Sequence, residues 1–199
     1  VDDFGICYHH TADLNHLINA LSDIFHVEVH PTGTKFLGLT VDYNRSARAI
    51  TLSYPGFIKA LLTRVRPNGI KHADTPAIYT PPSYGRKGPQ PATQLPPSTP
   101  ATADEVSQLR TIVGSLLYYS LAVDSTILPA VCALACQQAC ATAHTLKAAD
   151  RLLGYVAKQA KASITYRPSD MLLRAHSDAS YLSRPFSGSV AGGYRDLGK

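Results

Sequence analysis

LRTIVGSLLYY, residues 109–119, is the stretch that decides the fold of this sequence. Apolar side chains recur through it at helical spacing, so it predicts a helix with one buried face. That face comprises Val106, Leu109, Ile112, Val113, Leu116 and Leu117. Thr102 and Glu105 precede it at the spacing of a capping box, which predicts where the helix begins. One of Tyr118 and Tyr119 is expected in the core, while the other could stack on a nucleic-acid base.

Two further helices are predicted downstream. The first runs from a polar cap at Asp124 or Ser125 to about residue 141, and the second runs from about residue 142 to 159. Cys132, Cys136 and Cys140 lie four residues apart and form a stripe on the first of them. No His or further Cys completes a usual zinc spacing, so we interpret the stripe as part of tight helix packing.

The C-terminal part predicts strands at 162–167, 171–177 and 186–194. The second strand delivers Asp178 at its end. Gly192 and Gly193, inside the third strand, indicate a bulge or a close approach of two backbones.

The N-terminal part predicts a strand at 4–8, a helix over 11–25, a β-hairpin of 34–43 and 48–53, and a helix over 54–65. Residues 76–100 then carry eight of the fourteen prolines. Proline has no N–H to donate, so this stretch is neither helix nor sheet interior. An extended linker and a packed surface loop both fit it. The fold class expected from all these elements is α+β.

Composition favours a folded protein, since 45% of the residues are apolar and 17% are charged. No apolar run is long enough for a membrane span, so no membrane partner is expected. Between Arg45 and Lys87 there are eight basic residues and one acid, Asp74. Such an excess suits a polyanion such as nucleic acid, but charge alone favours a solvated basic face slightly more.

Two acidic positions could carry chemistry. Asp2 and Asp3 are adjacent carboxylates, which repel each other unless a cation lies between them. A tight turn can direct such a pair at Mg²⁺, and two such ions stabilise the attacking and leaving oxygens of phosphoryl transfer. Asp178 at a strand end could do the same. Each signal alone is weak, because most such acids are ordinary turn or strand-end residues.

Short motifs follow one another in a characteristic order along the chain. Val1-Asp2-Asp3 is similar to the end of a YVDD signature, and residues 35–39, KFLGL, are similar to a KYFLGI-type strand. Residues 51–62 with Asp74-Thr75-Pro76 are similar to an LSQxxYIxxLL…TP stretch. Further likenesses are LRTIVGSLLYY to YRSLVGSLLYL, residues 148–155 to an AAKRVLRYL helix, 176–181 to GYSDADW, and 188–194 to STSGYVF. Together and in this order, the motifs resemble those of reverse transcriptases in copia-type retrotransposon Pol polyproteins.

The resemblance implies a reverse transcriptase running into RNase H. Residues 1–53 would be a partial palm, 54–75 the start of the thumb, 76–101 a Pro-rich linker, 102–161 connection helices, and 162–199 a truncated RNase H-like start. The implied catalytic and metal-binding residues are Asp2, Asp3 and Asp178, with Mg²⁺ or Mn²⁺ as cofactor. Lys35, Arg64, Arg66 and Lys71 would contact nucleic acid, and the strand at 35–41 would lie near the primer end.

The implied partners are an RNA template, a DNA primer, an RNA–DNA hybrid and the remainder of the Pol polyprotein. The implied location is intracellular, in the cytoplasmic virus-like particle and in the nucleus at integration. Because the chain opens at Val1 without an initiator methionine, we expect an internal fragment with parts of both active sites outside it. Tyr181 replaces the family's usual Trp, and Asp196 does not match the RNase H Glu. The alternative function is that of a non-catalytic nucleic-acid-binding remnant of a degenerate element.

Overall fold

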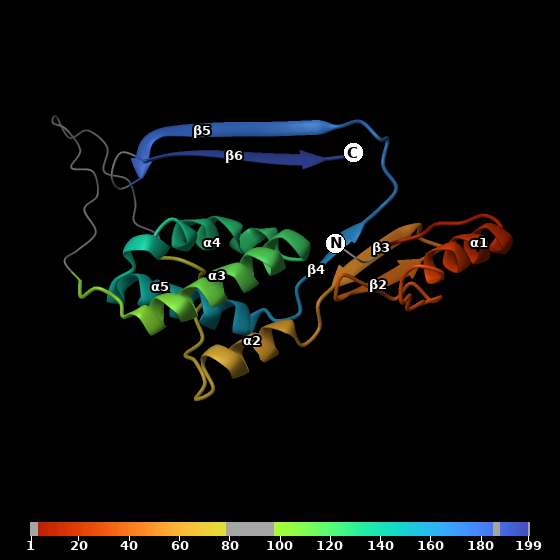
Figure 1. The fold of residues 1–199 in the computed structure, drawn as a ribbon. Helices are drawn as coiled ribbons and strands as arrows, with labels where there is room; N and C mark the ends of the chain where they lie inside the picture. The colour runs from red at the N-terminus through yellow and green to blue at the C-terminus, as the bar shows by residue number, and fades with distance from the viewer. Residues whose placement is uncertain (1–3, 79–97, 185–187, 199) are drawn as a thin grey trace.

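The computed structural model describes residues 4–78, 98–184 and 188–198, and the protein is of mixed α+β type, as predicted (Figure 1). The helices are α1 (Thr11–Ser22), α2 (Phe57–Val65), α3 (Ala103–Ala122), α4 (Leu128–Ala135) and α5 (Ala143–Lys158), with short 3-10 turns at Ser125–Ile127 and Gln138–Cys140. The strands are β1 (Lys35–Phe36), β2 (Leu39–Asn44), β3 (Ala49–Ser53), β4 (Ser163–Tyr166), β5 (Arg174–Arg184) and β6 (Gly188–Asp196). Asp2, Asp3 and most of the predicted 76–101 linker lie outside the described residues.

The core lies among helices α2 to α5, with α3 in contact with the other three (Figure 1). The predicted face of α3 is confirmed at Leu109, Ile112, Val113 and Leu116, which are all buried. Full burial of one such side chain stabilises the fold by about 1.5–3 kcal/mol, so this face contributes much of the stability of the packing of α3 against the other helices. Within the described ranges, no helix combines the length and apolar character needed to cross a membrane.

The predicted capping box at the start of α3 is also confirmed. The Glu105 amide donates to the Thr102 hydroxyl at 3.3 Å, and the Thr102 amide donates to the Glu105 carboxylate at 2.8 Å. These bonds satisfy two of the amides that a helix leaves without partners at its N-terminus. Helix α5 was expected to be capped by Thr142 or Thr145, and Thr142 is the capping residue: its amide donates to the Thr145 hydroxyl at 3.3 Å.

A four-stranded antiparallel sheet, ordered β1-β2-β3-β4, adjoins this core. The predicted hairpin between β2 and β3 is confirmed. Strand β4 comes from far along the chain and pairs with β3, with Ile164 opposite Leu52. Residues 162–167, expected with the C-terminal unit, therefore belong to the sheet of the N-terminal half. Ile164 finds an apolar neighbour there, which sequence spacing alone does not reveal.

Several local predictions differ from the structure. The expected continuous strand over 34–43 is broken by a tight turn at Leu37-Gly38, and residues 4–8 form no strand. The predicted helix running to about residue 141 is confined to α4, with Cys132, Cys136 and Cys140 all exposed. Cys132 is exposed because α4 buries the side that carries Val131 and Leu134, whereas Cys136 and Cys140 lie beyond the last residue of α4.

Strands β5 and β6 form a separate two-stranded hairpin, which Figure 1 shows above the helices. The prediction that Asp178 ends a strand is wrong, since β5 runs from Arg174 to Arg184 and Asp178 lies within it. Gly192 and Gly193 are in regular register, opposite Asp178 and Ser177. Of the two alternatives expected at these glycines, the bulge is wrong, because the irregularity in register lies between Ser180 and Arg184.

Candidate functional site

Asp178 is the candidate catalytic acid that the structure describes. It is exposed on β5, directly across the ladder from Gly192. One carboxylate oxygen accepts a 2.9 Å hydrogen bond from the Ala179 amide, and the opposite residue has no side chain to crowd it. The carboxylate is therefore open to a hydrated cation or to a partner.

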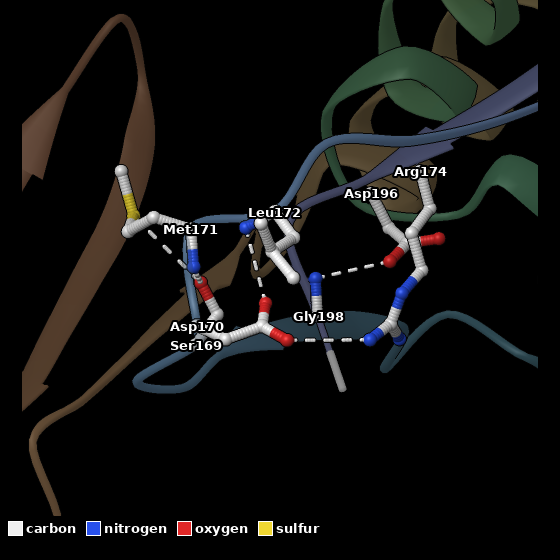
Figure 2. Close-up of polar contacts among 7 residues, drawn as sticks. All are labelled: Ser169, Asp170, Met171, Leu172, Arg174, Asp196 and Gly198. Carbon is white, nitrogen blue, oxygen red and sulfur yellow. Dashed lines mark hydrogen bonds and ion pairs between the residues drawn. The ribbon is translucent and has the colours of Figure 1, made fainter.

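The hairpin does not bring a second acid to Asp178. Asp196 lies on the same face, but four residues beyond Gly192 along β6, which separates the two carboxylates by about 13 Å. The Asp196 side chain instead accepts a 3.0 Å hydrogen bond from the Gly198 amide (Figure 2). Across the described parts of the chain, no cluster of three or more His, Cys, Asp or Glu residues could hold a metal ion.

A polar turn fixes the start of β5 (Figure 2). The Asp170 carboxylate accepts hydrogen bonds from the Leu172 amide at 3.1 Å and the Arg174 guanidinium at 3.3 Å. The Ser169 hydroxyl accepts one from the Met171 amide at 3.2 Å. These bonds satisfy the backbone while Met171 adopts a left-handed φ of 59°. The apolar run at 171–173 that was expected to lead into Asp178 is exposed.

The turn at Leu37-Gly38 is held against helix α3. Both residues have positive φ, 51° and 76°, as a two-residue hairpin loop of the primed type requires. The Tyr118 hydroxyl donates a 2.6 Å hydrogen bond to the Leu37 carbonyl. A Cβ at Gly38 would lie 2.8 Å from the Tyr54 hydroxyl, so a larger residue there would displace that ring. Lys35 is exposed on the adjoining strand β1.

Aromatic rings connect this turn to the core. Tyr54 and Phe57 stack with ring centroids 4.4 Å apart, and Phe57 stacks on Tyr119 at 5.6 Å. Tyr119 is buried whereas Tyr118 is 41% exposed, so the prediction that one of the two is in the core is confirmed. Burial raises the pKa of the Tyr119 hydroxyl, and the nearby charge of Asp124 raises it further.

Of the four cations expected to bind nucleic acid, the three that follow β3 in the chain differ in their surroundings. Arg64 is exposed and donates to the Ser115 hydroxyl at 3.2 Å, and Lys71 is exposed. The Arg66 guanidinium instead donates to Asp150 at 2.8 Å and to the Val65 carbonyl at 2.6 Å. It also donates to Gln108 on α3, so it joins α2 to α3 and α5. Arg64 and Lys71 are thus available to a phosphate, while Arg66 supports the fold.

The segment after α2 lies directly against α5. Lys158 forms a 2.6 Å ion pair with Asp74, and Arg151 donates to the Thr75 hydroxyl at 2.6 Å. The hydrogen bond and the charge of Lys158 lower the pKa of the Asp74 carboxyl, and the same pair raises the pKa of Lys158. Gly154 allows this approach, because a Cβ there would overlap the Lys71 carbonyl oxygen. The stretch 74–76 and the helix 148–155 of the resemblance are therefore in contact.

Sequence reasoning missed one exposed surface. Tyr43, Ile50 and Tyr166 form a row across β2, β3 and β4, and all three are exposed. The alternation of apolar and polar residues within β2 and β3 was a signal for this surface, but the pairing of β3 with β4 was not predicted.

Comparison with protein-family models, curated proteins and solved structures finds no match to this chain.

Proposed function

We propose that this chain is part of a copia-type retrotransposon RNA-directed DNA polymerase with RNase H. In this proposal Asp2 and Asp3 hold Mg²⁺ or Mn²⁺ for two-metal phosphoryl transfer, and Asp178 is the first carboxylate of the RNase H site. The finer fold is then a partial palm, thumb and connection helices, and the first strands of an RNase H-like fold. Support comes from the order of the motifs along nearly the whole chain.

The observation that carries the proposal is the turn at Leu37-Gly38. Leucine is disfavoured at positive φ, yet Leu37 is held there with its side chain 40% exposed. Strained residues of this kind persist where the surrounding structure fixes them, and they cluster at functional sites. Tyr118, from the most characteristic motif of the resemblance, fixes this one. In the proposal the turn contacts the primer end, with Lys35 on its phosphates.

Asp178 by itself makes a weak metal site. Mg²⁺ requires near-octahedral oxygen coordination, which one acid and bound waters supply poorly. The 199 residues alone are therefore expected to be inactive as a nuclease, and also as a polymerase, because the family's upstream carboxylate is not among them. The partners in this proposal are an RNA template, a DNA primer and the remainder of the Pol polyprotein.

The test uses a longer polypeptide from the same reading frame, assayed for primer extension and for cleavage of RNA in an RNA–DNA hybrid. Asp2→Asn or Asp3→Asn should abolish extension and leave cleavage intact, and Asp178→Asn should do the reverse. Asp23→Asn, at the exposed end of α1, is the matched control and should change neither. Full activity of an Asp variant would remove that residue from the catalytic set. Nucleic-acid binding without either activity would favour the alternative of a non-catalytic remnant.

A further inference from the structure

The outer end of the β2-β3-β4 sheet carries an aromatic row. Register places Tyr43 opposite Ile50 and Ile50 opposite Tyr166, so the three side chains lie side by side on one face. They are 53%, 39% and 54% exposed, respectively. Adjacent strands are about 4.8 Å apart, so the two tyrosines are separated by roughly 10 Å with an isoleucine between them.

Arginines surround this row. Arg48 and Arg167 line the same shallow depression as the two tyrosines, Ile50 and Pro168. The Arg45 guanidinium lies over the Tyr43 ring, 5.6 Å from its centroid. Among the residues that the structure describes, no acid lines the depression, and Asp42 points to the opposite face because it neighbours Tyr43 in the strand.

The opposite face of the sheet has a different chemistry. It carries Asp42, Thr51 and Thr165, and the two threonine hydroxyls are hydrogen-bonded at 2.9 Å. Exposed apolar side chains also occur on α1 and on the β5-β6 hairpin, so exposure alone does not distinguish the aromatic row. Its distinguishing features are two tyrosines at regular strand spacing and a rim of positive charge.

We propose that this face is a stacking platform for single-stranded nucleic acid. Tyr43 and Tyr166 lie under two bases, Ile50 fills the space between them, and Arg48 and Arg167 contact the phosphates. The Arg45 guanidinium lies over the Tyr43 ring, and a base can stack on the guanidinium itself. This goes beyond the proposed function, because it requires neither carboxylate site and would hold without catalysis.

The chemistry fits this partner better than a protein surface. Bases stack on aromatic rings on sheet surfaces with little sequence preference, because every base has a π-face. A loss of about 1–3 kcal/mol per stacked base corresponds to a 5- to 150-fold loss of affinity. Two phosphate contacts give a slope of about −1.4 for log affinity against log salt on a single strand.

The test measures binding of the 199-residue chain to labelled dodecamers of thymidine or uridine by fluorescence anisotropy over a salt series. Tyr43→Ala and Tyr166→Ala should each weaken binding about 5- to 150-fold. Tyr43→Phe and Tyr166→Phe should retain it, because stacking needs the ring and not the hydroxyl. Arg48→Gln and Arg167→Gln should each reduce the salt slope by about 0.7. Circular dichroism checks that every variant is folded.

Matched controls come from the β5-β6 hairpin. Tyr181 is 85% exposed and Arg195 is exposed, so Tyr181→Ala and Arg195→Gln remove the same groups elsewhere and should leave affinity unchanged. The proposal is overturned if the chain binds neither oligonucleotide, or if the Ala variants bind as tightly as the parent. It is also overturned if the Ala variants abolish self-association in sedimentation while oligonucleotide binding persists, since the face would then contact protein. Loss of polymerase activity in the longer polypeptide would leave it untouched.

Discussion

Replacing Gly154 with alanine should destabilise the protein, although helix propensity alone predicts that alanine would stabilise it. Gly154 lies within α5, where alanine is favoured over glycine by about 1 kcal/mol. A Cβ at this position, however, would overlap the Lys71 carbonyl oxygen and lie 3.3 Å from the Ala73 amide nitrogen. Both contacts are with backbone, so no side chain can rotate away to relieve them.

The magnitude follows from these two opposed effects. Overpacking costs about 1–3 kcal/mol of stability. The upper end of this range applies because the backbone segment 71–73 must move as a unit. Subtracting the gain of about 1 kcal/mol in helix propensity leaves a net loss of about 2 kcal/mol. For a chain of this size that corresponds to a lower Tm by about 4–8 °C. The displaced segment would also weaken the contacts of Asp74 with Lys158 and of Thr75 with Arg151.

Thermal and urea unfolding followed by circular dichroism would measure this loss. Gly114→Ala is the matched control, because Gly114 also lies within a helix, α3, but nothing lies within 4 Å of a Cβ there. That variant should be more stable than the parent by about 0.5–1 kcal/mol. If Gly154→Ala were as stable as the parent, the close approach of residues 71–73 to α5 would be refuted.

Three further predictions concern the cap, the turn and the basic surface. Hydrogen bonds from Thr102 lower the pKa of the Glu105 carboxyl. The ionised carboxylate therefore contributes its full stabilisation of the folded state above the ordinary pKa of about 4.3, and this contribution is lost as pH falls through the lowered folded-state pKa. Glu105→Gln keeps an acceptor that does not titrate, and urea midpoints should then depend less on pH below about 4. Leu37→Asn should raise stability by about 0.5–1 kcal/mol in urea unfolding, because asparagine tolerates positive φ; a loss of stability would show that the turn is not strained. Arg64→Glu combined with Lys71→Glu should weaken binding to duplex nucleic acid and reduce the slope of log affinity against log salt by about 0.9 per lost phosphate contact. The control Arg110→Glu, at another exposed arginine, should have a smaller effect. Equal effects of the two changes would contradict the assignment of Arg64 and Lys71 to nucleic-acid binding. Arg66 is left unchanged in that test, because its loss would leave Asp150 without its partner.

The helical core was predictable because its signals are local. The capping box needs only Thr102 and Glu105, and the buried face of α3 needs only the spacing of its own apolar residues. Helix α5 was predicted for the same reason. In each case the residues that decide the structure lie within one or two helical turns of each other.

The remainder depended on contacts between distant residues. The pairing of β3 with β4 joins residues more than a hundred positions apart, and no local pattern specifies which strand Ile164 adjoins. The turn at Leu37-Gly38 was read as strand because leucine rarely occupies the left-handed region, and the Tyr118 hydroxyl that holds it comes from a helix far along the chain. For Asp178, the apolar run before it suggested a strand end, but the ladder with β6 continues past it to Arg184.

The apolar face of the four-stranded sheet changes character as it leaves the core. Leu39 at the inner end is buried, and Val41, Leu52 and Ile164 in the next row are half-buried. At the outer row the aliphatic residues give way to Tyr43 and Tyr166, with Ile50 between them. Tyrosine presents an apolar ring with a polar tip, so it suits a surface that is wet at one time and covered at another. A face that served only the core would need no tyrosines at its edge and no arginines around them. Leu39 and Leu52 therefore anchor the sheet to the helical core, while the outer row remains exposed.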